Sequence, residues 1–181
     1  YFFKNYNIKF LEKNILITLH PEKNFNKELR QVKSFLNILK NFNDVYKIFT
    51  SSNSDAYGLG INNLVQKFTK RDKNSILIKT FGKDDYLSLI RHVNCVVGNS
   101  SSGIIEVPVL KKPTLNIGER QSGREMAKSI TNSTFEKSDI FIKLNKMINK
   151  KIKKKIYSPY YKKNTINFIL SKILKNLNEK I

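Results

Sequence analysis

The sequence predicts a fold of the α/β class, a doubly wound parallel sheet, from two observations. Short apolar runs alternate with longer amphipathic segments along most of the chain, and no hairpin signal separates one apolar run from the next. Strands that alternate with helices pair in parallel, and the helices pack on both faces of the sheet. At 181 residues the chain is long enough for one such domain with a sizeable core.

The individual elements follow from hydrophobic periodicity. Compact apolar runs predict five strands, and a weaker run at 129–131 predicts a short edge strand. Apolar residues at helical spacing predict the connecting helices, including one that ends near Lys70 and one that opens at Gly103. The expected strands are residues 14–19, 45–50, 75–80, 95–97 and 114–117, and the other expected helices are residues 25–42, 84–92, 136–148 and 165–177.

The most informative stretch is residues 94–124. Its apolar strand stops at Gly98, and small polar residues at 99–103 then open an apolar helix that carries Glu106. The first amides of a helix and the positive end of its dipole favour a phosphate group. Serines at such a turn also serve as helix caps without any ligand, so capping alone stays an alternative.

A second polar loop follows the next expected strand. The run at 114–117 ends in a glycine-punctuated loop at 118–124 that carries Arg120. Consecutive parallel strands deliver their following loops to the same edge of the sheet, which is where open α/β folds bind ligands. The two loops together therefore predict a ligand site at the carboxyl edge.

Three segments carry a family resemblance: GNSSSGIIEVP at 98–108, KPTLNIG at 112–118 and RQSGR at 120–124. They closely resemble the hydrolysing UDP-N-acetylglucosamine 2-epimerases, which make N-acetylmannosamine or a related sugar for sialic acid and its relatives. The non-hydrolysing epimerases usually have an Asp-Ser-Gly-Gly turn followed by an Arg-x-x-Thr-Glu-Arg-Pro-Glu loop. Neither pattern occurs here, so the resemblance favours the hydrolysing branch.

The resemblance implies a role for several residues at the carboxyl edge. His20, which follows the first strand and precedes Pro21, becomes the candidate catalytic or phosphate-contacting side chain. Each assignment has a structural alternative: a structural histidine, turn chemistry, a core phenylalanine, helix caps or solvated charges. The implied UDP-binding residues are Asn53, Phe81 against the uracil, Ser100 and Ser101 on the phosphates, Glu106 on the ribose, and Arg120.

The resemblance also implies a domain organisation. The fold is expected to be Rossmann-like and similar to the carboxyl-terminal domain of the glycosyltransferase-B-like fold. Residues 1–14 are expected to be a connector from an amino-terminal catalytic domain outside this chain, 15–160 the UDP-binding domain, and 161–181 a carboxyl-terminal helix.

The resemblance further implies partners and activity: the family forms homo-oligomers and acts on a UDP-N-acetylhexosamine. The general acid and base lie mainly in the other domain, so we expect this chain alone to be inactive.

Composition narrows the choice of partners. The formal net charge is +20, but the lysines lie mostly on polar helix faces, and no aromatic residues interleave the basic run at 150–155. We therefore expect the lysines to form a solvated surface. Two functions stay open as alternatives to the epimerase: a basic nucleic-acid-binding module, and half of a UDP-sugar glycosyltransferase. No apolar run is long enough for a membrane span, and the single cysteine, Cys95, suggests a reducing cytoplasm. No cofactor is expected, and no metal-ligand spacing is present.

Overall fold

The computed structural model describes residues 5–22, 25–52, 56–149 and 156–178. Strands and helices alternate as predicted, and most boundaries lie within a few residues of the expected ones. The strands are β1 (Lys13–Thr18), β2 (Val45–Thr50), β3 (Ser75–Ile78), β4 (Cys95–Gly98), β5 (Thr114–Ile117) and β6 (Ile130–Ser133). The helices are α1 (Phe25–Leu39), α2 (Ala56–Thr69), α3 (Lys83–His92), α4 (Ser102–Val109), α5 (Lys137–Ile148) and α6 (Thr165–Asn178).

The six strands form one sheet in the order β3-β2-β1-β4-β5-β6, and every neighbouring pair is parallel. The weak run expected at the edge is β6, which pairs with β5 from Thr114 opposite Ile130 onward. Strand order reverses between β1 and β4, where Ile15 lies opposite Cys95. This is the topological switch point of a doubly wound sheet, so the predicted fold class is confirmed.

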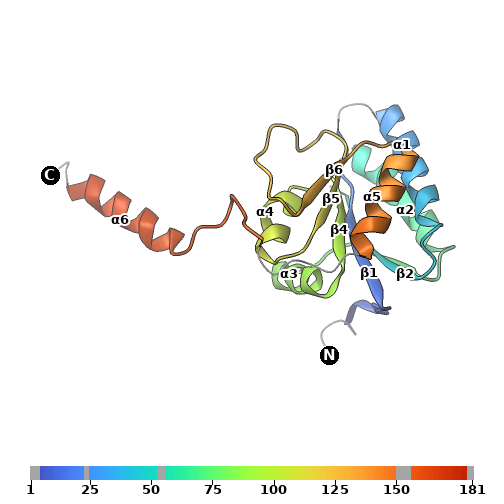
Figure 1. The fold of residues 1–181 in the computed structure, drawn as a ribbon, viewed down its shortest axis with the longest axis horizontal. Helices are drawn as coiled ribbons and strands as arrows, with labels where there is room; N and C mark the ends of the chain where they lie inside the picture. Colours follow the sequence, from blue (N-terminus) through green and yellow to red (C-terminus); the bar gives the residue numbers. More distant parts are fainter. Residues whose placement is uncertain (1–4, 23–24, 53–55, 150–155, 179–181) are drawn as a thin grey trace.

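Helices cover both faces of the sheet, as Figure 1 shows: α1, α2 and α5 lie on one side, and α3 and α4 lie on the other. The central strands are buried on both sides because their apolar residues alternate between two cores. Ile15 and Ile17 belong to the core under α1 and α5, whereas Leu16 belongs to the core under α3. Continuous apolar runs are typical of parallel strands that are covered on both faces.

The connection from β5 to β6 differs from the others because residues 118–129 form no helix. Gly118 and Gly123 have positive φ angles of 80° and 81°, a region in which glycine avoids the cost that other residues incur. The connection therefore leaves the carboxyl end of β5 as a long polar loop beside the switch point.

Helix α6 extends away from the sheet and its covering helices (Figure 1). Its apolar side chains are exposed, with Ile166 at 74% and Leu174 at 59%. No helix in the described parts of the chain is both long and apolar enough to cross a bilayer.

Candidate functional site

The switch point is built on an unusually close approach of two strands. Gly98, the last residue of β4, has a φ of +133°, and a Cβ at this position would lie 1.9 Å from the Thr18 carbonyl oxygen. The next residue, Asn99, donates its backbone N–H to that same oxygen at 3.2 Å. Because nothing larger than glycine fits there, the turn after β4 lies directly against the end of β1.

The polar turn at residues 99–103, called the serine turn below, leads into α4 without using its N-cap side chain as a cap. Ser101 occupies the N-cap position and makes no side-chain capping hydrogen bond. The turn is closed by the backbone instead, because the Gly103 amide donates to the Ser100 carbonyl at 3.1 Å. The Ile104 and Ile105 amides both donate to the Ser101 carbonyl at 3.0 Å. Capping therefore does not account for Ser101, whose hydroxyl stays available at the mouth of the turn.

Beneath the turn, α4 is fixed to β5. The Thr114 hydroxyl donates to the Gly103 carbonyl oxygen at 2.7 Å, and a Cβ on Gly103 would lie 2.9 Å from the Thr114 methyl group. Glycine at 103 thus lets the helix lie close to the strand. The orientation of the amides at the helix start follows from this contact.

His20 and Arg120, which the sequence places 100 residues apart, meet at the same turn. The backbone N–H of the half-buried His20 donates to the Asn99 side-chain oxygen at 2.7 Å. The Arg120 guanidinium donates to the Asn99 backbone carbonyl at 3.3 Å, and the Arg120 amide donates to Glu22 at 3.2 Å. The structure thus brings together the predicted residues His20, Ser100, Ser101 and Arg120.

Tyr86 joins the site from α3, although nothing in the sequence singled it out. Burial raises the pKa of the Tyr86 hydroxyl, the Ser102 and Thr18 side chains near it lower that pKa, and the charge of Glu106 raises it. Thr18 in turn shares a hydrogen bond of 2.6 Å with Thr50. Glu106, which the sequence predicts on the ribose, is exposed on α4 and close enough to act on this hydroxyl.

The remaining two predicted binding residues lie toward the β3 side. Phe81 follows β3, and its ring packs at 4.8 Å between centroids on Tyr6 and at 6.4 Å on Tyr86. Phe81 is partly buried and packs against the core under α3. Its contact with the uracil base stays a prediction. Asn53 lies outside the described residues.

A pocket of about 450 Å³ continues the carboxyl edge beyond β5. Gly118 lines it and also faces Glu22, so the pocket borders the serine-turn site. The sequence predicted a ligand site involving the 118–124 loop, but not the part of the pocket that β6 and α5 line, which depends on how this loop lies over β6. The lining residues are Asn116, Gly118, Ser122, Gly123, Arg124, Met126, Asn132, Ser133, Thr134 and Lys143.

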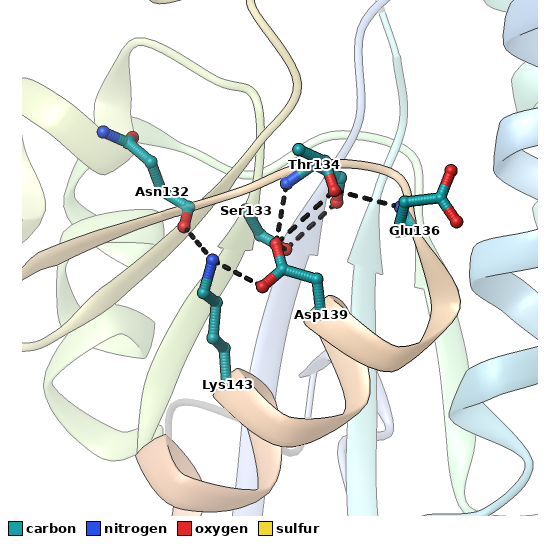
Figure 2. Close-up of polar contacts among 6 residues, drawn as sticks. All are labelled: Asn132, Ser133, Thr134, Glu136, Asp139 and Lys143. Carbon is teal, nitrogen blue, oxygen red and sulfur yellow. Dashed lines mark hydrogen bonds and ion pairs between the residues drawn. The ribbon is translucent and has the colours of Figure 1, made fainter.

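One wall of the pocket is held by an ion pair between successive turns of α5. Figure 2 shows Asp139 and Lys143 reaching the end of β6: Lys143 donates to the Asn132 carbonyl at 2.9 Å, and Asp139 accepts from the Ser133 hydroxyl at 2.9 Å. The Lys143 and Asp139 side chains themselves are 2.6 Å apart. Hydrogen bonds from Lys143 and the Thr134 amide hold the pKa of Asp139 at about 2.

A family model described as UDP-N-acetylglucosamine 2-epimerase matches residues 3–174. The chain belongs to the UDP-N-acetylglucosamine 2-epimerase family. The family expected from the serine turn and the loop after β5 is therefore confirmed. Over the described residues, no group of three His, Cys, Asp or Glu side chains could hold a metal ion in this epimerase-family domain.

Two curated relatives are similar in sequence over part of their length. The chain is 39% identical over 129 residues to the GDP/UDP-N,N'-diacetylbacillosamine 2-epimerase (hydrolyzing) of Campylobacter jejuni, covering 68% of this chain and 33% of that protein. It is 34% identical over 163 residues to polysialic acid biosynthesis protein P7 of Escherichia coli, covering 86% and 41%. The chain thus spans less than half the length of each relative.

Solved structures share the fold at low sequence identity. The S. aureus MnaA–UDP co-structure superimposes with a TM-score of 0.73 and 18% identity, covering 97% of this chain and 47% of that chain. A carboxyl-terminal domain of a group 1 glycosyl transferase from Francisella tularensis gives a TM-score of 0.56 at 15% identity, covering 82% and 81%. The expected similarity to a glycosyltransferase-B-like carboxyl-terminal domain is confirmed at the level of the fold.

Proposed function

We propose that this chain is the nucleotide-sugar-binding half of a hydrolysing UDP-N-acetylglucosamine 2-epimerase. The observation that carries the proposal is the serine turn, which opens α4 at the switch point with its N-cap hydroxyl unused. Helix N-termini at this position of an open α/β sheet favour diphosphates. The family membership of the chain supplies the class of ligand.

Each residue of the site has a role in this proposal. Ser100 and Ser101, through their hydroxyls and their own backbone amides, hold the phosphate oxygens of UDP. Arg120, held against the turn by the Asn99 carbonyl, neutralises part of the diphosphate charge. Glu106 accepts hydrogen bonds from the ribose hydroxyls. His20, at the end of β1, faces the phosphates and the reacting sugar.

The reaction proceeds by elimination and then addition. Loss of the C2 proton and departure of UDP from C1 leave a glycal, and water then adds across the double bond to give the 2-epimeric free sugar. Holding the leaving diphosphate is the part of this chemistry that the serine turn can supply. The chain spans 33% of the C. jejuni relative and 41% of the E. coli relative. We therefore propose that the remainder of the protein supplies the general acid and base, and that this chain binds UDP without turnover.

The names of the relatives support the finer assignment. The C. jejuni relative is a hydrolysing 2-epimerase of a UDP- or GDP-linked diacetylated sugar, and the E. coli relative acts in polysialic acid biosynthesis. We propose that the full-length protein releases N-acetylmannosamine, or a related sugar, for synthesis of a sialic or other nonulosonic acid in the cytoplasm.

Calorimetric titration of the chain with UDP tests the proposal. We expect saturable binding that Ser101→Ala and Glu106→Ala each weaken at least tenfold. Ser138→Ala is the matched control, because Ser138 is an exposed serine in the first turn of α5, and it should leave UDP affinity unchanged. Absence of UDP binding, or binding to nucleic acid that falls steeply with added salt and ignores UDP, would overturn the proposal.

A further inference from the structure

The Asn99 side chain pairs with both backbone groups of His20. Its oxygen accepts the His20 N–H at 2.7 Å, and its nitrogen donates to the His20 carbonyl at 2.8 Å. The carboxamide thus takes the place of one residue of a neighbouring strand. It continues the pairing of β1 with β4 one step past the end of the sheet, at the position where the predicted catalytic side chain begins.

The His20 backbone is consequently held from several directions. On the amino-terminal side it continues from β1, which lies between β2 and β4 in the middle of the sheet. On the carboxyl-terminal side it precedes Pro21, whose ring fixes its own φ and restricts the conformation of the residue before it. Laterally it is paired with Asn99. With the backbone set in this way, the direction of the His20 Cα–Cβ bond is fixed, and the imidazole can vary only through its χ1 and χ2 rotations.

Asn99 also ties two other loops to the same point. Its side-chain nitrogen donates a second hydrogen bond to Glu22 at 3.2 Å, and the Glu22 carboxylate accepts the Arg120 amide. The Asn99 carbonyl accepts from the Gln121 side chain at 2.8 Å and from the Arg120 guanidinium. One residue thus connects the loop after β1, the serine turn and the loop after β5.

Burial indicates that Asn99 acts through these neighbours and does not contact a ligand itself. The residue is 1% exposed, and both hydrogens of its side-chain amide are used, one by His20 and one by Glu22. The Gln121 side chain, which is also 1% exposed, donates to the Asn99 carbonyl and holds it in place. A carboxamide with these bonds already made has no donor left for a phosphate.

We propose that Asn99 is the positioning residue of the site, which sets the orientation of His20 relative to the serine turn and to Arg120. The inference rests on the proposed function for its ligand, UDP, but the contacts it invokes are present in the chain without any ligand. Its effect can therefore be measured on His20 as well as on binding.

Asn14 provides a matched control variant. It is an asparagine of β1 that is 4% exposed, and its amide likewise pairs with both backbone groups of one residue: it accepts the Leu11 N–H at 2.9 Å and donates to the Leu11 carbonyl at 2.7 Å. It lies at the opposite, amino end of the strand that leads to His20. Asn14→Ala and Asn99→Ala thus remove the same kind of bonds from opposite edges of the sheet.

The experiment records the imidazole signals of His20 by NMR, together with UDP affinity, in the 181-residue chain. The chain has two histidines, and a His92→Gln variant assigns their signals. We expect Asn99→Ala to shift the His20 signals and to weaken UDP binding about tenfold. Asn14→Ala should lower the urea midpoint of unfolding while leaving both the His20 signals and UDP affinity unchanged. If Asn99→Ala does not fold, Asn99→Ser is measured in its place.

The inference is overturned if the Asn99 variant moves the His20 signals no further than Asn14→Ala does, even if its UDP affinity falls. That result would limit Asn99 to a local effect on the turn. Failure of the wild-type chain to bind UDP would instead count against the proposed function, while the comparison of His20 signals would still decide the role of Asn99.

Discussion

Gly98 and Thr18 lie so close that a Cβ at position 98 would be 1.9 Å from the Thr18 carbonyl oxygen. This contact joins the ends of β4 and β1 at the switch point, and it brings the serine turn to within hydrogen-bonding distance of His20. The φ of +133° at Gly98 lies in a region that side chains rarely adopt. Both the spacing and the conformation therefore depend on glycine.

We expect Gly98→Ala to lower the free energy of unfolding by at least about 3 kcal/mol, because the added methyl group meets backbone that cannot move aside. Gly123→Ala is the matched control. Gly123 also has a positive φ, of 81°, but a Cβ there would meet nothing within 4 Å, so it should cost only about 1–2 kcal/mol. Urea unfolding of the two variants measures both costs, and equal costs would contradict the assignment of steric contact to Gly98.

The buried ion pair between Lys47 and Asp72 predicts an asymmetric response to mutation. The Lys47 side chain on β2 is 1% exposed, whereas that of Asp72 is 21% exposed, and their charged atoms are 2.7 Å apart. Asp72→Ala leaves an ammonium buried without its partner, which costs about 3–5 kcal/mol. Lys47→Met removes the buried charge and leaves a carboxylate that water can reach, so we expect it to cost less by at least about 1 kcal/mol.

The double variant of this pair serves as the internal check. Once Lys47→Met is present, Asp72→Ala no longer strands a buried charge, so the double variant should cost clearly less than the sum of the single variants. Strict additivity in urea unfolding would show that the two side chains act independently despite their contact.

Much of the fold follows from local sequence signals, whereas the connections within the site do not. Hydrophobic runs and helical periodicity depend on neighbouring residues, so the strands and helices were predictable, including the weak edge strand that became β6. The serine turn was predictable because Gly98 and the helix start are adjacent in sequence. By contrast, Asn99 meets His20 across 79 positions, and Gln121 meets Asn99 across 22. No local pattern encodes such pairs.

Tyr86 shows the same limit from another direction. In the sequence it occupies an apolar position of an amphipathic helix, where a tyrosine ring is expected to pack in the core. The structure confirms the packing but also places its hydroxyl near Thr18 and Ser102 at the end of the sheet. The position of the Tyr86 hydroxyl depends on how α3 packs against the sheet. That packing is a tertiary property, which the local sequence pattern does not show.

The Cys95 thiol should be almost inert in the folded chain. It is fully buried in β4, and burial raises its pKa to about 12 from an ordinary 9. Since the thiolate is the reactive form, this shift alone lowers its population roughly a thousandfold at a given pH. We expect Ellman's reagent at pH 8 to label the native chain at least ~100-fold more slowly than the chain in urea. Equal rates would show that β4 opens readily to solvent.

The network around Asp139 predicts a loss of stability in acid. The carboxyl group accepts hydrogen bonds from Lys143, Ser133 and the Thr134 amide, and its pKa falls from 3.8 to about 2. A folded-state pKa below the unfolded value means that the ionised group stabilises the fold above about pH 4, and that this contribution disappears as the pH falls through 2. The difference in melting temperature between wild type and Asp139→Asn should therefore be largest near pH 6 and shrink toward pH 2.

Asp44→Asn is the control: Asp44 is more exposed and pairs with Lys13 on the surface, so its effect should be smaller at every pH. A wild-type advantage over Asp139→Asn that stays constant between pH 6 and pH 2 would mean that the charge of Asp139 does not hold β6 against α5.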